Sequence, residues 1–166
     1  IVCWVPFNEA WGQFDTPEVV KFTRDLDPTR LINESSGGNF HFAGDIIDVH
    51  HYPTPAMNFF ERKFVNVLGE YGGIGYPIEG HTWIIDRKWG YGKVKENSEE
   101  LMAQYEDYLE MLKTFVTTGC AAAVYTQTTD VEGEVNGLMT YDRKVIKMDI
   151  PRIAKANKAV IESMSK

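Results

Sequence analysis

Two glutamates, Glu9 and Glu70, each follow a mainly apolar run of the sequence. The first run covers residues 1–7 and leads into Asn8-Glu9, and the second covers residues 64–69 and leads directly into Glu70. Two carboxyl groups that meet at a sugar can break a glycosidic bond, one as acid and base and the other as nucleophile or second base. This pair therefore predicts a glycoside hydrolase.

Each glutamate also has a plain alternative, a solvated loop carboxylate. At the C-terminal end of a buried strand, however, Glu9 would project over the mouth of a barrel, where partial desolvation suits an acid. Glu70 is flanked by glycines, which allow close approach of backbone and substrate, and as a nucleophile it needs hydrogen-bond donors in order to stay ionised. Tyr52 is a candidate donor, although ordinary packing would explain it equally well.

Apolar runs of this length are typical of strands buried on both faces of a parallel sheet. The pattern predicts five strands, at residues 1–7, 30–33, 46–50, 64–69 and 121–126. It also predicts a helix from a Thr16 cap to residue 26, with Val19, Phe22 and Leu26 on one face. A long helix from near residue 98 to Gly119 and a final helix after Pro151 complete the set.

Strands that alternate with helices indicate parallel βα units. A complete (β/α)8 barrel has about 250 residues, so the 166 residues of this chain suffice for about five units. The sequence also opens on Ile1, already inside a predicted strand, which indicates a piece of a longer barrel. We expect an α/β fold, a partial TIM (β/α)8 barrel, in a single domain of residues 1–166.

Charge and composition limit the partners. The formal net charge is −7 and the pI is about 5.1, which argues against a nucleic acid or an anionic membrane as partner. The sequence has no run of about 18 apolar residues that would predict a membrane span. The compartment is left open by these features.

Other chemical motifs are weak. His50-His51 lacks the spacing of a zinc site, and no Gly-x-Ser-x-Gly elbow indicates a serine hydrolase. The acidic residues in 130–134 lack the spacing of a calcium loop, so we expect a solvated loop there. Cys3 and Cys120 are expected to be buried thiols.

The segment 71–97 is too long for an ordinary βα loop, and such loops are often functional. Its rings can pack on the apolar faces of sugars, or they can anchor the loop to the domain. The rings of this segment belong to Tyr76, His81, Trp83, Trp89 and Tyr91.

Four motifs together resemble family 2 glycoside hydrolases, the family of β-galactosidases, β-glucuronidases and β-mannosidases. They are Trp-Val-Pro-Phe-Asn-Glu-Ala-Trp-Gly at 4–12, Asp-Pro-Thr-Arg at 27–30, Leu-Gly-Glu-Tyr-Gly-Gly at 68–73, and Tyr-Thr-Gln-Thr-Thr-Asp-Val-Glu-Gly-Glu-Val-Asn-Gly at 125–137. The order and spacing fit across nearly the whole chain.

The resemblance implies that the five strands are the fourth to eighth of a parent barrel. It implies Glu9 as acid/base, Glu70 as nucleophile, Asn8 as the asparagine that binds the sugar 2-hydroxyl, and Tyr52 as the tyrosine that supports the nucleophile. The reaction requires no cofactor, and although some relatives use metal ions, we assign no metal ligand. Gly73 stands where some β-galactosidases have a substrate-binding histidine, so the sugar stays open.

The sequence thus predicts a retaining β-glycosidase of β-galactosidase-like type, with a carbohydrate substrate. Trp11, Trp83 and Tyr125 are the further substrate-binding candidates. The alternative is a non-catalytic barrel fragment that binds carbohydrate or only assembles with another chain. A barrel opened before its fourth strand would expose strand edges, so we expect self-association and little activity of the isolated fragment.

Overall fold

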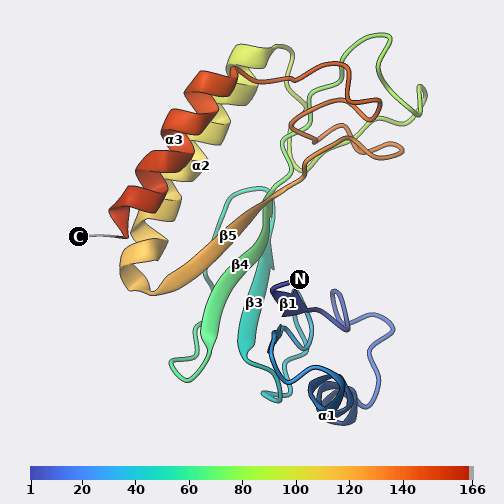
Figure 1. Cartoon of the computed structure of the whole chain (residues 1–166). Helices are drawn as coiled ribbons and strands as arrows, with labels where there is room; N and C mark the ends of the chain where they lie inside the picture. The colour runs from blue at the N-terminus through green and yellow to red at the C-terminus, as the bar shows by residue number, and fades with distance from the viewer. Residues whose placement is uncertain (165–166) are drawn as a thin grey trace.

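The structure, a computed structural model, describes residues 1–164 (Figure 1). Its elements in chain order are β1 (Cys3–Trp4), α1 (Thr16–Leu26), β2 (Leu31–Ile32), β3 (Ile46–His51), β4 (Val65–Gly72), α2 (Ser98–Thr118), β5 (Cys120–Thr126) and α3 (Ile150–Ser163). Each predicted strand segment contains a strand, although the ends differ. In this part of the chain, no helix has the length and apolar composition needed to cross a membrane.

The strands form two separate parallel sheets. β1 pairs with β2, and β3, β4 and β5 form a three-stranded sheet in that order. Parallel pairing brings the carboxyl ends of strands to one edge of a sheet, where ligands of α/β proteins commonly bind. The two longest loops, residues 73–97 and 127–149, leave β4 and β5 at this edge (Figure 1).

The predicted partial (β/α)8 barrel with five βα units is wrong. α1 joins β1 to β2 and α2 joins β4 to β5, but the described links from β2 to β3 and from β3 to β4 contain no helix. β1 is only two residues long, and the flanking Ile1, Val2 and Val5 are 77%, 84% and 51% exposed. An apolar run alone predicts a strand buried on both faces, but its burial also requires neighbouring layers.

Glu34 explains why the link between β2 and β3 is a compact loop. Glu34 is 1% exposed. Its carboxylate accepts hydrogen bonds of 2.6 to 3.2 Å from the four consecutive backbone amides of residues 41–44. These donors satisfy the buried carboxylate and the backbone together. The segment is therefore ordered without a helix.

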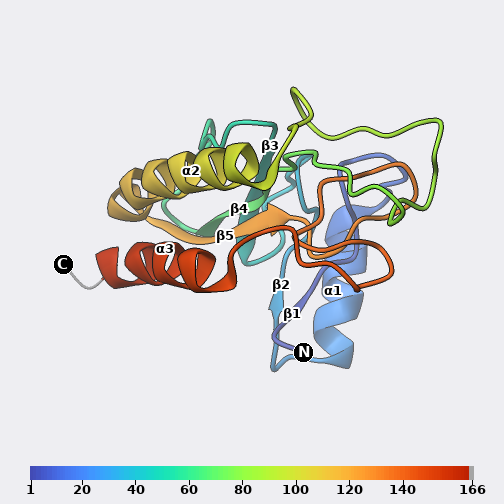
Figure 2. The same cartoon turned by 90° about the horizontal axis from the view of Figure 1, so that it is seen from above.

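The main hydrophobic core lies between the three-stranded sheet and α2, with α3 packed against it. α2 begins where the Asn97 side chain accepts from the Glu100 amide, and it ends at Gly119, which has φ 104°. Figure 2 shows α2 and α3 on the side of the molecule away from α1. The buried face of α2 has the helical spacing that the sequence predicts, with Leu101, Tyr105, Tyr108 and Leu112.

The N-terminal region, residues 1–45, contributes no member to this core cluster. Thr16 is not the predicted cap: its hydroxyl accepts from the Gln13 side chain, and Asp15 precedes α1 without a side-chain cap. The expected buried face of α1 is open as well, since Phe22 is 64% and Leu26 is 72% exposed. This region and the sheet region, residues 46–164, are therefore packed to different extents.

Candidate active site

Glu70 lies near the carboxyl end of β4, beside Tyr52. The Tyr52 hydroxyl donates to Oε2 of Glu70 and is also hydrogen-bonded to Oγ1 of Thr126, 2.7 Å away. Burial, and then the hydrogen bond to Glu70, raises the pKa of Tyr52 far above its usual value, so the hydroxyl keeps its proton at neutral pH. A permanent donor stabilises the ionised carboxylate that a nucleophile requires.

Tyr91 holds the Tyr52 ring in place. The two rings stack with their centroids 3.6 Å apart and an interplanar angle of 9°, and Trp89 packs edge-on against Tyr91. Gly73 leaves the space for this stack, because a Cβ at that position would overlap the Tyr91 ring. The loop that follows β4 therefore reaches back over the site and orients the donor to Glu70.

Glu9 is held by an unusual backbone conformation. Glu9 has φ 52° and Ala10 has φ 68°, both in the left-handed region that non-glycine residues seldom adopt. The Glu9 amide donates to the Ser36 carbonyl oxygen at 2.7 Å, and the Glu9 side chain is 44% exposed. Backbone strain of this kind clusters at functional sites. Here it presents a carboxylate to solvent at a fixed place.

His50 lies between the two glutamates. Its Nδ1 is 3.1 Å from Oε1 of Glu9 and 3.4 Å from Oε2 of Glu70, and its side chain is only 6% exposed. One oxygen of each glutamate and one ring nitrogen all lie within 4.8 Å of one another. Sequence reasoning missed this role, although a signal was present: His50 precedes Tyr52 by two residues at the end of β3, and such residues share a side of a strand.

The far side of the His50 ring faces buried polar groups. Oγ of Ser36 is 2.7 Å from Nε2 of His50 and donates to Oδ2 of Asp48 at 2.6 Å. The Asn33 amide donates to the same oxygen at 2.6 Å. Asp48 is 3% exposed, and within residues 1–164 its Oδ1 has no hydrogen-bond partner, although it lies 3.8 Å from Nε2 of His50. The ring thus has a carboxylate on both sides.

Two glycines make room for this network. A Cβ at Gly37, which has φ 90°, would lie 2.5 Å from Nδ1 of His50, and a Cβ at Gly69 would overlap the carboxylate of Asp48. Neither position accepts a side chain unless the ring or the carboxylate moves. The glycine before Glu70 therefore serves the buried Asp48, whereas the sequence had suggested close approach to a substrate.

Three other predicted residues lie outside these hydrogen bonds. Asn8 precedes Glu9, is exposed and forms an isolated parallel bridge with Ser36. Trp11 is 77% exposed and follows Glu9 by two residues. Trp83 packs against a tyrosine of the other long loop, with ring centroids 5.9 Å apart. Asn8 and Trp11 thus flank Glu9 in the chain, whereas Trp83 belongs to the contact between the long loops.

Tyr125 was also a substrate-binding candidate, but the structure places it against the core. Its ring packs edge-on against Tyr71 and Tyr105, and its hydroxyl accepts from the Ile74 amide at 3.0 Å. Burial raises the pKa of Tyr125 well above its ordinary value. The residue therefore fixes the end of β5 and the start of the loop after β4.

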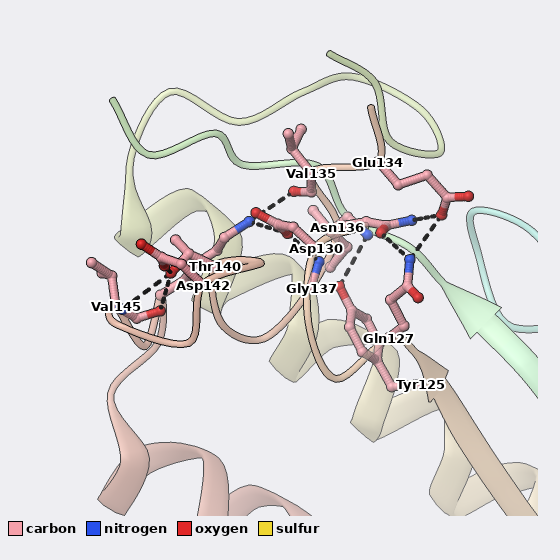
Figure 3. Close-up of polar contacts among 12 residues, drawn as sticks. Tyr125, Gln127, Asp130, Glu134, Val135, Asn136, Gly137, Thr140, Asp142 and Val145 are labelled. Atoms are coloured by element: carbon pink, nitrogen blue, oxygen red, sulfur yellow. Dashed lines mark hydrogen bonds and ion pairs between the residues drawn. The ribbon is translucent and has the colours of Figure 1, made fainter. Parts of the chain in front are cut away.

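The loop after β5 is built around a buried ion pair (Figure 3). Nζ of Lys147 donates to Oδ1 of Asp130 at 2.6 Å and to the carbonyl oxygen of Val135 at 3.0 Å. Burial raises the pKa of Asp130 and lowers that of Lys147, while their mutual hydrogen bond opposes both shifts. The expectation of a solvated acidic loop is wrong for Asp130, which is 4% exposed.

Glu134 joins this loop to the end of β5. Its Oε2 accepts from the side chains of Gln127 at 2.9 Å and Asn136 at 3.0 Å (Figure 3). Burial raises the pKa of Tyr91, and the charge of Glu134 is the next largest cause, ahead of the charges of the two paired glutamates. Tyr91 therefore faces three carboxylates, and Glu134 is a neighbour of the site that the sequence did not indicate.

The cluster of Glu9, His50 and Glu70 has the residue types of a metal site. Its ligand atoms are already engaged, however, since Glu9 contacts His50 and Glu70 accepts from Tyr52. Because the present contacts of these atoms are to protein groups, we build no step on a metal ion and assign no metal ligand here.

No protein-family model matches the chain, and no curated protein matches it. Its function has to be inferred from the site residues themselves.

Proposed function

We propose that the protein is a retaining β-glycosidase in which Glu9 is the acid/base and Glu70 the nucleophile. One observation carries this proposal: a carboxylate oxygen of Glu9 and one of Glu70 lie within 4.8 Å of each other. Retaining glycosidases hold these groups about 5 to 5.5 Å apart, whereas inverting enzymes need about 6.5 to 9.5 Å to admit a water molecule. The short separation favours direct attack on the sugar.

The surroundings of the two carboxylates support this division of roles. Glu70 accepts from a tyrosine hydroxyl that keeps its proton, which favours an ionised nucleophile. The Glu9 side chain contacts the ring of His50. It is 44% exposed, whereas the side chain of Glu70 is 30% exposed. Glu9 is therefore the carboxyl group that is more accessible to a leaving group.

In the first step, an oxygen of Glu70 attacks the anomeric carbon while Glu9 gives its proton to the glycosidic oxygen. The bond to the leaving group breaks as the bond to Glu70 forms. In the second step, Glu9 takes a proton from a water molecule, whose oxygen attacks the same carbon and displaces Glu70. Two inversions retain the anomeric configuration.

The resemblance to family 2 glycosidases supports a β-galactoside-like substrate. It assigns the sugar 2-hydroxyl to Asn8, and the exposed Trp11 offers an aromatic face next to Glu9. The site differs at Gly73, where the space beside the backbone is filled by Tyr91. We therefore propose that Tyr91 occupies the position that a substrate-binding histidine takes in some β-galactosidases.

A second candidate is a non-catalytic module that binds carbohydrate or assembles with another chain. The exposed edge strand β5 favours it: β5 pairs only with β4 in its sheet, and residues 121–124 are all exposed. Free strand edges favour pairing with a second chain. We propose that the chain self-associates through this edge, whether or not it is an enzyme.

Covalent trapping distinguishes the two candidates. At least one of the activated 2-deoxy-2-fluoro β-glycosides of galactose, glucose, mannose and glucuronic acid should leave a glycosyl adduct on Glu70, seen by peptide mass spectrometry. Glu70→Gln should abolish the adduct, and Glu132→Gln, an exposed loop position, should leave it unchanged. With a natural β-glycoside, NMR should show the β-anomer first.

Lack of an adduct with all four probes, together with no hydrolysis of the matching aryl β-glycosides, would refute glycosidase activity of this chain toward these four sugars. That result would favour the non-catalytic module.

A further inference from the structure

We propose that His50 shares the acid proton with Glu9, so that the acid of the site is a Glu9–His50 pair that carries one proton between Oε1 and Nδ1. Ser36 and Asp48 fix the tautomer of the ring in this arrangement. The inference rests on the proposed role of Glu9, but the state of the ring can be tested without any turnover.

The tautomer follows from the single proton of a hydroxyl group. Ser36 donates to the buried carboxylate of Asp48 at 2.6 Å, a charge-assisted bond. Its proton is then not free for His50, so Nε2 of His50, 2.7 Å away, has to donate to Oγ of Ser36. Asp48 Oδ1, at 3.8 Å from the same nitrogen, favours a proton there as well.

The consequence appears at the other nitrogen. With a proton on Nε2, a neutral ring would present the lone pair of Nδ1 to carboxylate oxygens of Glu9 at 3.1 Å and Glu70 at 3.4 Å. Two anions facing a lone pair repel it, so a proton has to lie between them. Glu70 already accepts a hydrogen bond from the Tyr52 hydroxyl, so the proton beside Nδ1 is shared with Glu9.

The surrounding charges agree with a retained proton. The ring faces Glu9 from the segment after β1, Asp48 from β3 itself and Glu70 from β4, with the neutral hydroxyl of Tyr52 beside Glu70. Within residues 1–164, no lysine or arginine forms an ion pair with these three carboxylates. Neutral groups donate to Asp48 and Glu70, and within the described residues the shared proton supplies the positive charge.

The number of protons on the pair is the same before and after the two steps of the reaction. The pair gives its one proton to the leaving oxygen and becomes an ionised Glu9 beside a neutral, Nε2-protonated His50. The proton taken from water in the second step restores the pair. Each turnover therefore returns the pair to its starting state with one proton shared between Oε1 and Nδ1.

Nitrogen-15 NMR of the histidine rings in the full chain tests the tautomer. Near neutral pH, His50 should show a protonated Nε2, identified by the loss of its signals in His50→Asn. His81 provides an internal contrast. Its Nδ1 lies 2.9 Å from Oδ2 of Asp142 and should carry the ring proton, as a donor to that carboxylate. An unprotonated Nε2 in His50 would overturn the proposal, even if glycosidase activity is found.

The pH–rate profile tests the shared proton. The His50→Asn variant keeps an amide that can bind Glu9 but cannot accept its proton. For a substrate with a poor leaving group, kcat/KM should fall about tenfold or more and the alkaline limb should move to lower pH, whereas an activated aryl glycoside should lose about twofold or less. An equal loss on both substrates with an unmoved limb would make His50 a positioning residue only and would overturn the shared proton.

Failure of the proposed function gives a different pattern. A chain without adduct or turnover that still shows a protonated Nε2 in His50 would refute the glycosidase and retain the ring arrangement.

Discussion

The two carboxylates stand on regions that are built differently. Glu70 belongs to β4, the central strand of the three-stranded sheet, whose neighbour Leu68 is fully buried in the main core. Glu9 follows the two-residue strand β1, and the N-terminal region around it adds nothing to that core. The proposed nucleophile is thus supported by close packing, and the proposed acid by individual polar contacts.

The polar contacts of the N-terminal region connect β1, α1 and β2. The Trp4 indole donates to Asp27 at 3.0 Å, which connects β1 to the end of α1. Arg24 donates to Asp45 at 3.0 Å, and Asp45 also accepts from the Ile32 amide at 2.8 Å. Contacts of this kind each contribute little stability at a surface, so the position of Glu9 depends on many small terms. The candidate site thus joins a carboxylate on a strand of the main core to one that follows a two-residue strand outside it.

The largest expected effect separates the two glutamates. Glu70→Gln should reduce turnover of every substrate by roughly 10⁴-fold or more, because no covalent intermediate can form. Glu9→Gln should cost about 10²- to 10⁴-fold on alkyl glycosides but far less on activated aryl glycosides, whose leaving groups need little protonation. Steady-state kinetics on both substrate types give the answer. Equal losses in Glu9→Gln would remove it from the acid role.

A substitution in the sheet region should lower the free energy of unfolding more than one on the exposed face of α1. Leu68→Ala should lower the free energy of unfolding by about 3 kcal/mol, because it opens a cavity in the core. Phe22→Ala on α1, where the ring is 64% exposed, should change it by less than about 0.5 kcal/mol. Urea denaturation measures both. A large loss from Phe22→Ala would show that α1 is covered in solution, and the contrast between the regions would fail.

Self-association tests whether copies of the chain contact one another through the β5 edge or through the N-terminal region. Light scattering should show a mass that rises with protein concentration, and Ala122→Lys on the exposed edge strand β5 should suppress the rise. Val2→Lys, at an 84% exposed position of the N-terminal region, should have a smaller effect. If only Val2→Lys suppresses association, the N-terminal region is the contact surface and the β5 edge is not.

The smallest effect is a dependence on pH. The hydrogen bond from the Thr29 side chain, followed by that from Trp4, lowers the pKa of Asp27 to about 2 from a model-compound value of 3.8. A depressed carboxyl pKa stabilises the fold above about pH 4, and this contribution is lost as the pH falls toward 2. Hydrogen exchange in residues 1–36, corrected for intrinsic rates, should therefore accelerate in this window.

The control for this prediction is Asp27→Asn, in which the acceleration should disappear. Asp142, in the loop after β5, has its pKa lowered still more strongly by Thr140 and then by His81, so that loop should stay protected to lower pH. Simultaneous acceleration in both segments in the wild type would contradict the assignment of the effect to Asp27.

Local patterns in the sequence determined most elements and part of the site. The start of α2 near residue 98 and its end at Gly119 follow from neighbours within a few residues of each other, which is why the sequence predicts them well, whereas the cap by Asn97 is a finding of the structure. Apolar runs in the sequence also mark the positions of Glu9, Glu70 and Tyr52. In the structure, both glutamates contact the ring of His50, and Tyr52 donates to Glu70.

Only the tertiary structure decided what surrounds these residues. The barrel prediction failed because burial of a strand on both faces depends on distant segments, and the ends of β1 stay exposed. His50, Ser36 and Asp48 form one network only because β3 lies beside the segment after β2, which no local pattern encodes. A side chain acquires its chemistry from contacts that are remote in sequence, so the glutamates can be found by pattern, whereas the contact between Glu9 and His50 cannot.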